Sequence, residues 1–290
     1  MKLDNVGLVY KKNGELAHDV SFRKVDDALR VLSADYGFVY DKIIRDEMTS
    51  GFSEDKDLIL VLAGDNTLAS ISQMADVPLL GVNSDMSGST GFLLKSDPDR
   101  FSEHMIALLC GVQGKDYFIG DYSRVESYIE TTSGNVIPVN LALNELLVAN
   151  SAQHHPAKYT LEYRGEKERQ SSSGVVLSTP IGSTAWNYDL GGDILDLDKK
   201  QVQFVVREDM RNNMTCGMIE EGEAVKITSL GNHNYVVPDA YDNAIQPFPY
   251  NSVLTVKVAE DDVQLVSFDA EFRDPAQMER LTGKPYVRRV

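Results

Sequence analysis

A carboxylate stands where a buried strand is predicted to give way to a helix. Residues 63–67, Ala-Gly-Asp-Asn-Thr, directly follow the apolar run at 58–62. Ligands of open α/β sheets bind beyond the carboxyl ends of strands, and the free N–H groups of a helix start suit phosphate. Asp65 would there orient a hydroxyl group and accept its proton close to a phosphate. The alternative is structural: Asp65 and Thr67 cap the helix, and Gly64 makes the turn.

A second segment combines hydroxyl side chains, a glycine and an aromatic ring. Residues 178–186, Ser-Thr-Pro-Ile-Gly-Ser-Thr-Ala-Trp, follow a predicted strand at 174–177, and Trp186 is the one tryptophan of the chain. Small residues let backbone N–H groups approach a ligand, and an aromatic side chain can cover a flat base. The pattern equally fits a hydroxyl-rich loop around an ordinary core tryptophan.

The third segment is an amide beside a carboxylate in an apolar stretch. Asn144 and Glu145 lie within residues 141–148, which are otherwise apolar and predict a strand. Burying both polar groups is costly unless each is hydrogen-bonded. They therefore either face a polar ligand or mark an edge strand that is wet on one side.

The elements around the first segment indicate a parallel sheet covered by helices. Apolar residues at helical spacing predict a helix that ends near Gly37, and further helices are expected after Thr67 and after Pro98. The run at 58–62 predicts a strand buried on both faces, and the run at 78–82 predicts the next strand. Strands and helices in alternation predict a Rossmann-like α/β domain.

After Tyr122 the apolar period becomes two, as at Tyr159, Leu161 and Tyr163. Turns containing glycine separate these runs, which is typical of antiparallel β structure. We therefore expect an α/β domain at 1–115, a β-rich domain at 116–267, and a tail at 268–290 that packs back on the first domain. Residues 274–280 of this tail predict a short helix.

Composition excludes several classes of protein. The 290 residues include 28 basic and 44 acidic side chains, a formal net charge of −16. Such a surface repels nucleic acids and anionic membranes, but a nucleotide pocket can still bind phosphate through backbone N–H groups and a divalent cation. No run approaches the ~18 apolar residues of a membrane span. Two cysteines and no secretory signal at the start predict a cytoplasmic, reduced protein.

Several nucleotide and metal motifs are absent. The chain has no P-loop and no Gly-x-Gly-x-x-Gly after a strand, so neither a P-loop mechanism nor ordinary dehydrogenase binding of NAD is expected. It also lacks the His and Cys clusters of a zinc site. The remaining candidates are the three segments above.

Taken together, these segments resemble the NAD kinase family, within the larger group that also holds the diacylglycerol and sphingosine kinases. The resemblance covers about residues 55–270 and rests on four matches in family order. The family's Gly-Gly-Asp-Gly-Thr loop matches residues 63–67, its Gly-Ile-Asn … Gly-Phe-Leu segment matches 81–83 and 91–93, its Asn-Glu pair matches 144–145, and its Thr-Pro-Thr-Gly-Ser-Thr-Ala-Tyr loop matches 179–186.

The resemblance implies transfer of a phosphoryl group from ATP to the 2′-hydroxyl of the adenosine ribose of NAD, giving NADP. It makes Asp65 the proton acceptor, with Mg²⁺ held through the donor phosphates and no protein ligand to the metal. The implied substrate-binding residues are Gly64, Asn66, Thr67, Asn83, Phe92, Asn144, Glu145, His155, Ser183, Thr184, Ala185, Trp186 and Asp189. His155 could approach a phosphate, or it could be a solvent-facing loop residue beside His154. A homodimer or homotetramer is implied by the resemblance alone.

The chain also departs from the family pattern. Ala63 and Asn66 replace two glycines of the loop, and Asn66 puts a side chain where donor phosphates should pass. The seven residues at 84–90 form a longer loop, as in the branch that includes mitochondrial NAD kinases. Ile181 and Ser173 replace a threonine and an aspartate. These departures leave two alternatives open: a catalytically weak or silent NAD-binding regulatory protein, and a lipid kinase of the diacylglycerol kinase type.

Overall fold

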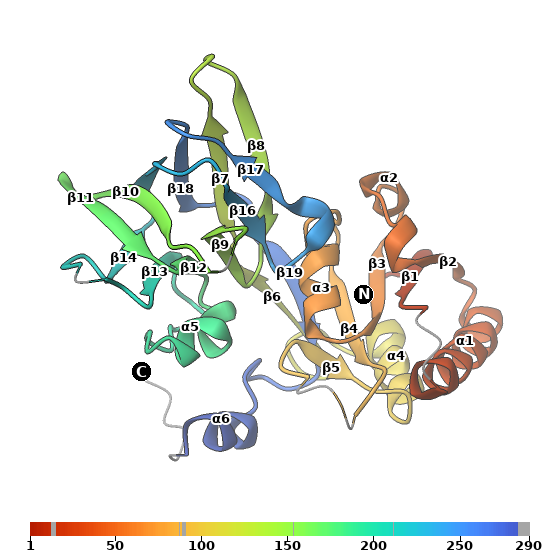
Figure 1. Ribbon diagram of the computed structural model, residues 1–290. Helices are drawn as coiled ribbons and strands as arrows, with labels where there is room; N and C mark the ends of the chain where they lie inside the picture. Colours follow the sequence, from red (N-terminus) through yellow and green to blue (C-terminus); the bar gives the residue numbers. More distant parts are fainter. Residues whose placement is uncertain (13–15, 87, 89–90, 153, 211, 284–290) are drawn as a thin grey trace. The chain divides into compact units, whose positions relative to one another are not determined.

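The computed structural model describes residues 1–12, 16–86, 88, 91–152, 154–210 and 212–283 (Figure 1). These residues form two compact units. The first contains Met1–Asp121 and the chain from Val263 onward, and the second contains Tyr122–Asp262. The division differs from the expected one at 115 and 267, because β6 (Phe118–Tyr122) and β19 (Val263–Ser267) both join the sheet of the first unit.

The first unit contains a seven-stranded sheet in the order β2-β1-β3-β4-β19-β6, with β5 paired to β4. Its other strands are β1 (Asn5–Tyr10), β2 (Val39–Ile44), β3 (Leu58–Ala63), β4 (Leu79–Asn83) and β5 (Leu94–Ser96). β1, β3 and β4 are parallel neighbours, and every residue of β3 and β4 is buried. The sequences of these two strands are almost continuously apolar because helices cover both faces of the sheet. The predicted Rossmann-like α/β layer is confirmed.

Helices flank this sheet on both sides (Figure 1). They are α1 (Leu16–Tyr36), α2 (Ser50–Ser53), α3 (Asp65–Ser72), α4 (Phe101–Cys110) and α6 (Pro275–Thr282), with a 3₁₀ turn η1 (Arg45–Glu47). Leu29 of α1 and Met105 of α4 share one apolar core with Leu60 of β3. On the opposite face, Leu68 of α3 packs against Gly81 of β4. The predicted helices are confirmed.

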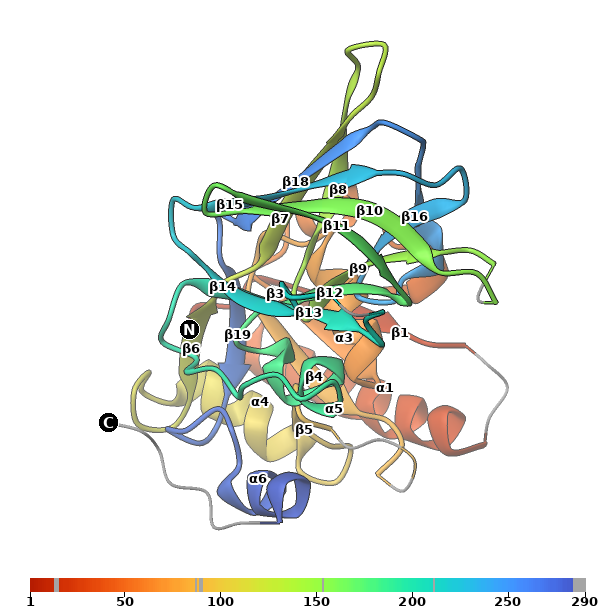
Figure 2. The ribbon, with the colours of Figure 1, turned by 60° about the vertical axis from the view of Figure 1, so that its left-hand side comes forward.

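The second unit consists of two six-stranded antiparallel sheets (Figure 2). One has the order β11-β10-β15-β18-β7-β8 and the other β14-β13-β12-β9-β16-β17. The strands are β7 (Val125–Glu130), β8 (Val136–Ala142), β9 (Glu145–Asn150), β10 (Ala157–Tyr163), β11 (Glu166–Ser172), β12 (Gly174–Ser178), β13 (Gln201–Arg207), β14 (Cys216–Glu220), β15 (Ala224–Ser229), β16 (Asn234–Pro238), β17 (Gln246–Phe248) and β18 (Val253–Val258). Short helical turns η2 (Gly182–Thr184), α5 (Trp186–Asp189) and η3 (Asp242–Ala244) complete it.

The alternating pattern of this unit places one side of each strand in a common core. Tyr159, Phe204 and Phe248, from three different strands, are fully buried there. The β10–β11 hairpin turns at Arg164 and Gly165, whose φ angles of 48° and 82° match the primed turns that suit twisted hairpins. The predicted antiparallel β-rich region is confirmed.

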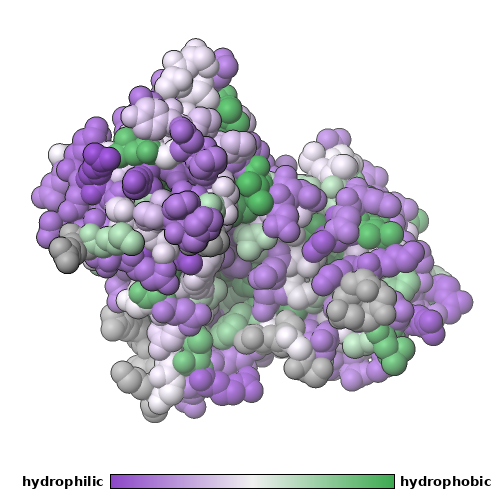
Figure 3. All heavy atoms as spheres, viewed as in Figure 1, coloured by the Kyte–Doolittle hydropathy of each residue, from purple (hydrophilic) through white to green (hydrophobic). Residues whose placement is uncertain are grey.

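The surface agrees with the acidic composition. Hydrophilic side chains dominate the face seen in Figure 3, and the apolar ones are scattered in small groups. Within the described residues, no helix is long and apolar enough to cross a membrane. Cys110 and Cys216 are both exposed free thiols.

Candidate active site

Asp65 begins α3, one residue after β3 ends, at the carboxyl edge of the parallel sheet. The side chain of Asp65 does not cap this helix. Asp65 Oδ2 accepts the N–H of Phe92 at 3.1 Å, and Oδ1 accepts the N–H of Leu93 at 2.8 Å. The carboxylate is half-buried and joins the end of β3 to a loop almost thirty residues further on. The Asp65 side chain therefore links the end of β3 to the residues just before β5.

Asn83 and Gly91 shape the same loop. Asn83 ends β4, is buried, and accepts the N–H of Asp85 through Oδ1 at 3.0 Å. Gly91 has a φ of 68°, and a Cβ there would lie 2.9 Å from Asn83 Nδ2. The glycine of the Gly-Phe-Leu motif is thus required by both conformation and space. The fold brings Asn83, Phe92 and Asp65 together, as the motifs predicted for one site.

Asn66, by contrast, needs no special backbone. Asparagine replaces a family glycine here, and it is the residue other than glycine that best tolerates a left-handed backbone. Asn66 instead lies in the first turn of α3 and is absent from the positive-φ residues of the described chain. Its side chain is exposed, Gly64 precedes the helix with an extended backbone, and Thr67 is buried. The helix start therefore forms without glycine at position 66.

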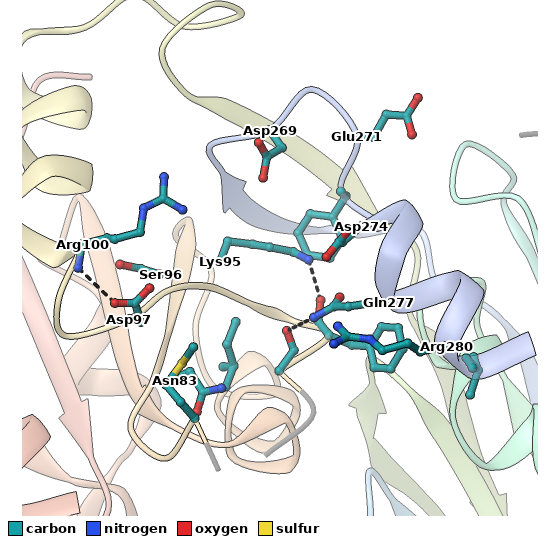
Figure 4. A pocket seen from close by; sticks show the side chains of 16 residues that line it. Asn83, Lys95, Ser96, Asp97, Arg100, Asp269, Glu271, Asp274, Gln277 and Arg280 are labelled. Carbon is teal, nitrogen blue, oxygen red and sulfur yellow. Dashed lines mark hydrogen bonds between the residues drawn. The ribbon is translucent and has the colours of Figure 1, made fainter. Parts of the chain in front are cut away.

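A cavity of about 690 Å³ opens beside this loop, within the first unit (Figure 4). Asn83, Gly91 and Phe92 line one side of it. The rest of its lining was missed by sequence reasoning: Met86, Leu94, Lys95, Ser96, Asp97, Arg100, Asp269, Glu271, Phe272, Asp274, Gln277, Arg280 and Leu281. No pattern in the sequence signals that the segment 269–281 meets the loop at 91–97.

Lys95 is the most unusual charge in this cavity. Its Nζ donates to the carbonyl oxygen of Phe92 at 2.6 Å and lies 4.3 Å from the centre of the Phe272 ring. Burial lowers the pKa of Lys95 from 10.5 to about 8, although the charges of Asp65, Asp269 and Asp274 raise it. An ammonium group is thus held in a poorly hydrated place next to the Asp65 loop.

In the second unit, the stretch predicted as one strand at 141–148 is broken. β8 ends at Ala142 and β9 begins at Glu145. Asp239 bridges the break, accepting the N–H groups of Leu143 at 2.9 Å, Asn144 at 2.7 Å and Glu145 at 3.2 Å. A buried carboxylate thus replaces the strand partner that these N–H groups would otherwise need. The partner comes from almost a hundred residues away, so the local pattern could not reveal it.

β9 is not an edge strand, so that interpretation of Asn144 and Glu145 was wrong. It pairs with β12 on one side and β16 on the other. Both side chains are buried, and Glu145 Oε2 has no hydrogen-bond partner among the described residues. Burial, and secondly the charge of Asp239, raise the pKa of Glu145 from 4.5 to about 8. Glu145 is therefore mainly a neutral acid at pH 7, able to donate one hydrogen bond.

The loop at 179–186 packs directly on this break. The N–H of Thr179 donates to the carbonyl oxygen of Asn144 at 2.9 Å, and a Cβ on Gly182 would lie 2.1 Å from the same oxygen. Ser183 Oγ donates to Pro180 O at 2.7 Å and accepts the N–H of Leu195 at 2.9 Å. The serine hydroxyl thus fixes the loop. Sequence motifs 35 to 40 residues apart are brought into contact.

The last residues of this loop differ in exposure. Thr184 is buried, Ala185 and Asp189 are exposed, and Trp186 is half-buried. Trp186 packs against an apolar cluster of Leu147, Ala149, Val176 and Val237. The guanidinium of Arg207 lies 4.5 Å from the centre of the indole ring. Arg207 was not expected from the sequence, because it comes from β13, outside every motif.

His155 is not brought to this place. It is exposed in the loop that follows β9, whereas Asn144 and Glu145 stand at the start of that strand. The five residue-to-residue steps from Glu145 to Asn150 span about 16 Å. The ring of His155 lies 4.3 Å from that of His154. His155 therefore does not lie beside the Asn-Glu pair within one chain, and its approach to a phosphate stays a prediction.

Among the described residues, no group of three or more His, Cys, Asp or Glu side chains could hold a metal ion. Mg²⁺ held through the phosphates of a donor stays a prediction.

Comparison with known proteins gives a consistent result. No family model matches the chain. An NAD kinase from Clostridium perfringens is 26% identical over 272 residues, covering 91% of this chain and 94% of that protein. An NAD kinase from Picrophilus torridus is 24% identical, covering 84% and 87%. The resemblance predicted from four motifs is thereby confirmed over most of the chain.

Solved structures share the fold. An NAD kinase from Archaeoglobus fulgidus in complex with ATP aligns with a TM-score of 0.73 at 19% identity, over 97% of this chain and 99% of that one. A yeast NADH kinase complexed with NADH aligns with a TM-score of 0.77 at 16% identity, over 99% and 90%. The fold is therefore that of the NAD and NADH kinases.

Proposed function

We propose that this chain is an NAD kinase, which transfers a phosphoryl group from ATP to the 2′-hydroxyl of the adenosine ribose of NAD and releases NADP and ADP. The observation that carries the proposal is the joint one: similarity to NAD kinases over nine tenths of the chain, with Asp65 at the carboxyl edge of the parallel sheet. A sugar hydroxyl is a poor nucleophile at neutral pH, so a carboxylate there supplies what the reaction needs.

In the proposed step, the 2′ oxygen forms a bond to the terminal phosphorus of ATP while the bond from that phosphorus to the bridging oxygen breaks. The hydroxyl proton passes to Asp65. Each carboxylate oxygen has two lone pairs, and the N–H groups of Phe92 and Leu93 occupy one on each oxygen. The other lone pairs remain for the hydroxyl. Mg²⁺ on the donor phosphates would neutralise the charge that develops during transfer.

We propose that most of the residues that bind NAD come from the second unit. Asn144, Thr184 and Ala185 would hold the adenine and ribose of NAD, and Trp186 would pack on the dinucleotide, as would Phe92 of the first unit. Glu145 as a neutral acid suits a ribose hydroxyl, because it can donate one hydrogen bond and accept another. Its orphaned Oε2 is the donor or acceptor that such a sugar would satisfy.

The remaining proposals concern the setting of the enzyme. We propose that it works in the cytoplasm, with Mg²⁺, as a homodimer or homotetramer. Light scattering on the purified protein measures its mass, and a monomer at micromolar concentration would contradict the oligomer.

The direct test is formation of NADP from ATP, Mg²⁺ and NAD, read by a dehydrogenase specific for NADP. We expect NADP only when all three are present. Protein that binds NAD in calorimetry yet makes no NADP with any phosphate donor would be the regulatory alternative instead. Phosphorylation of diacylglycerol without formation of NADP would favour the lipid kinase.

A further inference from the structure

The ammonium group of Lys95 lacks partners for its charge. Among the described residues it makes one hydrogen bond, to the carbonyl oxygen of Phe92, and no ion pair. Two of its three N–H groups are left without a protein acceptor. The Lys95 Nζ lies 4.3 Å from the centre of the Phe272 ring, and Figure 4 shows the Lys95 side chain among the residues that line the cavity. A half-buried cation in this state is stabilised by an anion that completes its surroundings.

The same ammonium group is tied to the proposed catalytic carboxylate through one residue. The N–H of Phe92 donates to Asp65 Oδ2, and the carbonyl oxygen of Phe92 accepts from Lys95 Nζ. The carboxylate of Asp65 and the ammonium group of Lys95 are thus both hydrogen-bonded to the backbone of Phe92. Among the charges that raise the pKa of Lys95, that of Asp65 acts most strongly. Lys95 therefore belongs to the Asp65 site and not to a separate surface.

Most other charges that line the cavity are more exposed than Lys95. Arg100 and Arg280 line it, as do Asp97, Asp269, Glu271 and Asp274. All of these are exposed except Asp97, whose Oδ1 accepts the N–H groups of Asp99 and Arg100. Arg273 adds a positive charge that lowers the pKa of Lys95. Exposed charges are screened, so the half-buried Lys95 is the least screened positive charge among the residues that line the cavity.

We propose that the Lys95 ammonium binds a phosphate group of the polyphosphate chain of the donor, in the cavity of the first unit. This inference rests on the proposed function, which requires such a donor near Asp65. A lysine binds phosphate as a point charge with three donors, and two of those donors are unused here. A nucleoside triphosphate and inorganic polyphosphate present the same chemistry, and the experiment below separates them.

The first experiment measures how fast Lys95 is acetylated by trace acetic anhydride, with mass spectrometry of its peptide. Separate samples contain ATP, sodium tripolyphosphate or adenosine, and exposed Lys115 is the internal control. We expect ATP to slow acetylation of Lys95 at least about fivefold and to leave Lys115 unchanged, as for a charged amine taken up by an anion. Protection by tripolyphosphate as well would identify the phosphate chain as sufficient, whereas protection by ATP alone would add the nucleoside to the requirement.

The proposal is overturned if neither ATP nor tripolyphosphate protects Lys95, or if adenosine alone protects it equally. This test needs no catalysis. A wild-type protein that shows protection but makes no NADP would contradict the proposed function and leave the phosphate site standing.

The second experiment uses the Lys95→Met variant. We expect the KM for ATP to rise about 10- to 100-fold, as for a lost charge-assisted hydrogen bond, with the KM for NAD within about twofold. Lys95→Arg should recover most of the loss because it keeps the charge, and Lys115→Met should match the wild type. An unchanged KM for ATP in Lys95→Met, or an equal rise for NAD, would contradict the assignment.

Discussion

The two units hold their key carboxylates in opposite ways. In the first, Asp65 is half-buried, and each of its oxygens accepts a backbone N–H, from Phe92 and from Leu93. In the second, Glu145 is buried and one of its oxygens has no partner in the described part of the chain, while neighbouring Asp239 accepts the N–H groups of residues 143–145. The consequence is a neutral acid at Glu145, whose pKa is raised to about 8.

The two carboxyl groups are therefore suited to different roles. Under the proposed function, two backbone N–H groups hold Asp65 in place to accept the proton of the substrate hydroxyl. A neutral acid in a dry place is suited to hydrogen bonding with a ligand that must be gripped. The pKa of Glu145 is raised first by burial and secondly by the charge of Asp239.

The largest expected effect comes from Asp65→Asn. Loss of the proton acceptor should lower kcat about 10²- to 10⁴-fold, and affinity for NAD should stay within about tenfold. Steady-state kinetics and NAD calorimetry measure the two quantities. Asp76→Asn, an exposed position after α3, serves as the matched control and should be unchanged.

Turnover near the wild-type level in Asp65→Asn would remove Asp65 from the chemistry. If Asp65 only orients the backbone at 92–93, the variant should instead lose thermal stability and affinity together with rate.

Removing the Asp239 carboxylate tests whether it stabilises the break between β8 and β9 in the second unit. Asp239→Ala leaves three buried N–H groups without their acceptor, so the free energy of unfolding should fall by about 2–4 kcal/mol. Urea unfolding measures it. Asp242→Ala, three residues further on and exposed, should change it by less than about 0.5 kcal/mol. Equal stability of the two variants would show that Asp239 does not hold the break between β8 and β9.

Glu145→Gln tests whether Glu145 is neutral in the folded protein. The pKa of about 8 exceeds the ordinary value of 4.5, so the folded state binds an extra proton between these values. The wild type should therefore lose stability as pH rises from 4.5 towards 8, and the variant should not. We expect the variant to gain about 2–4 kcal/mol relative to wild type between pH 5 and pH 8.5.

Urea unfolding at both pH values measures the gain, and exposed Glu221→Gln is the control, expected to show none. A pH-independent difference between Glu145→Gln and wild type would mean that Glu145 is ionised in the folded protein.

The smallest effect is expected for Asn66→Gly, which restores the family glycine. The side chain is exposed in the first turn of α3, so its removal should keep or raise kcat, by less than about threefold, and cost up to about 1 kcal/mol of stability. Kinetics and thermal unfolding check both. A large loss of rate would show that Asn66 makes a specific contact with substrate.

Local pattern predicted much of the fold. The all-apolar run of β3 and the alternation of β10 each indicated the correct kind of sheet, since burial on two faces or one leaves that trace. The motif at 63–67 was correctly placed between a strand and a helix. What failed was long-range: Asp239 reaches Asn144 from far along the chain, and Lys95 meets Phe272 across the fold. A single sequence carries no local signal for either contact.

The most direct test of the central claim is a crystal structure of the protein with NAD and a non-hydrolysable analogue of ATP. The proposed mechanism predicts a carboxylate oxygen of Asp65 within about 3.2 Å of the 2′ oxygen of the adenosine ribose, or one water away from it. A 2′ oxygen remote from Asp65, with no bridging water, would contradict it.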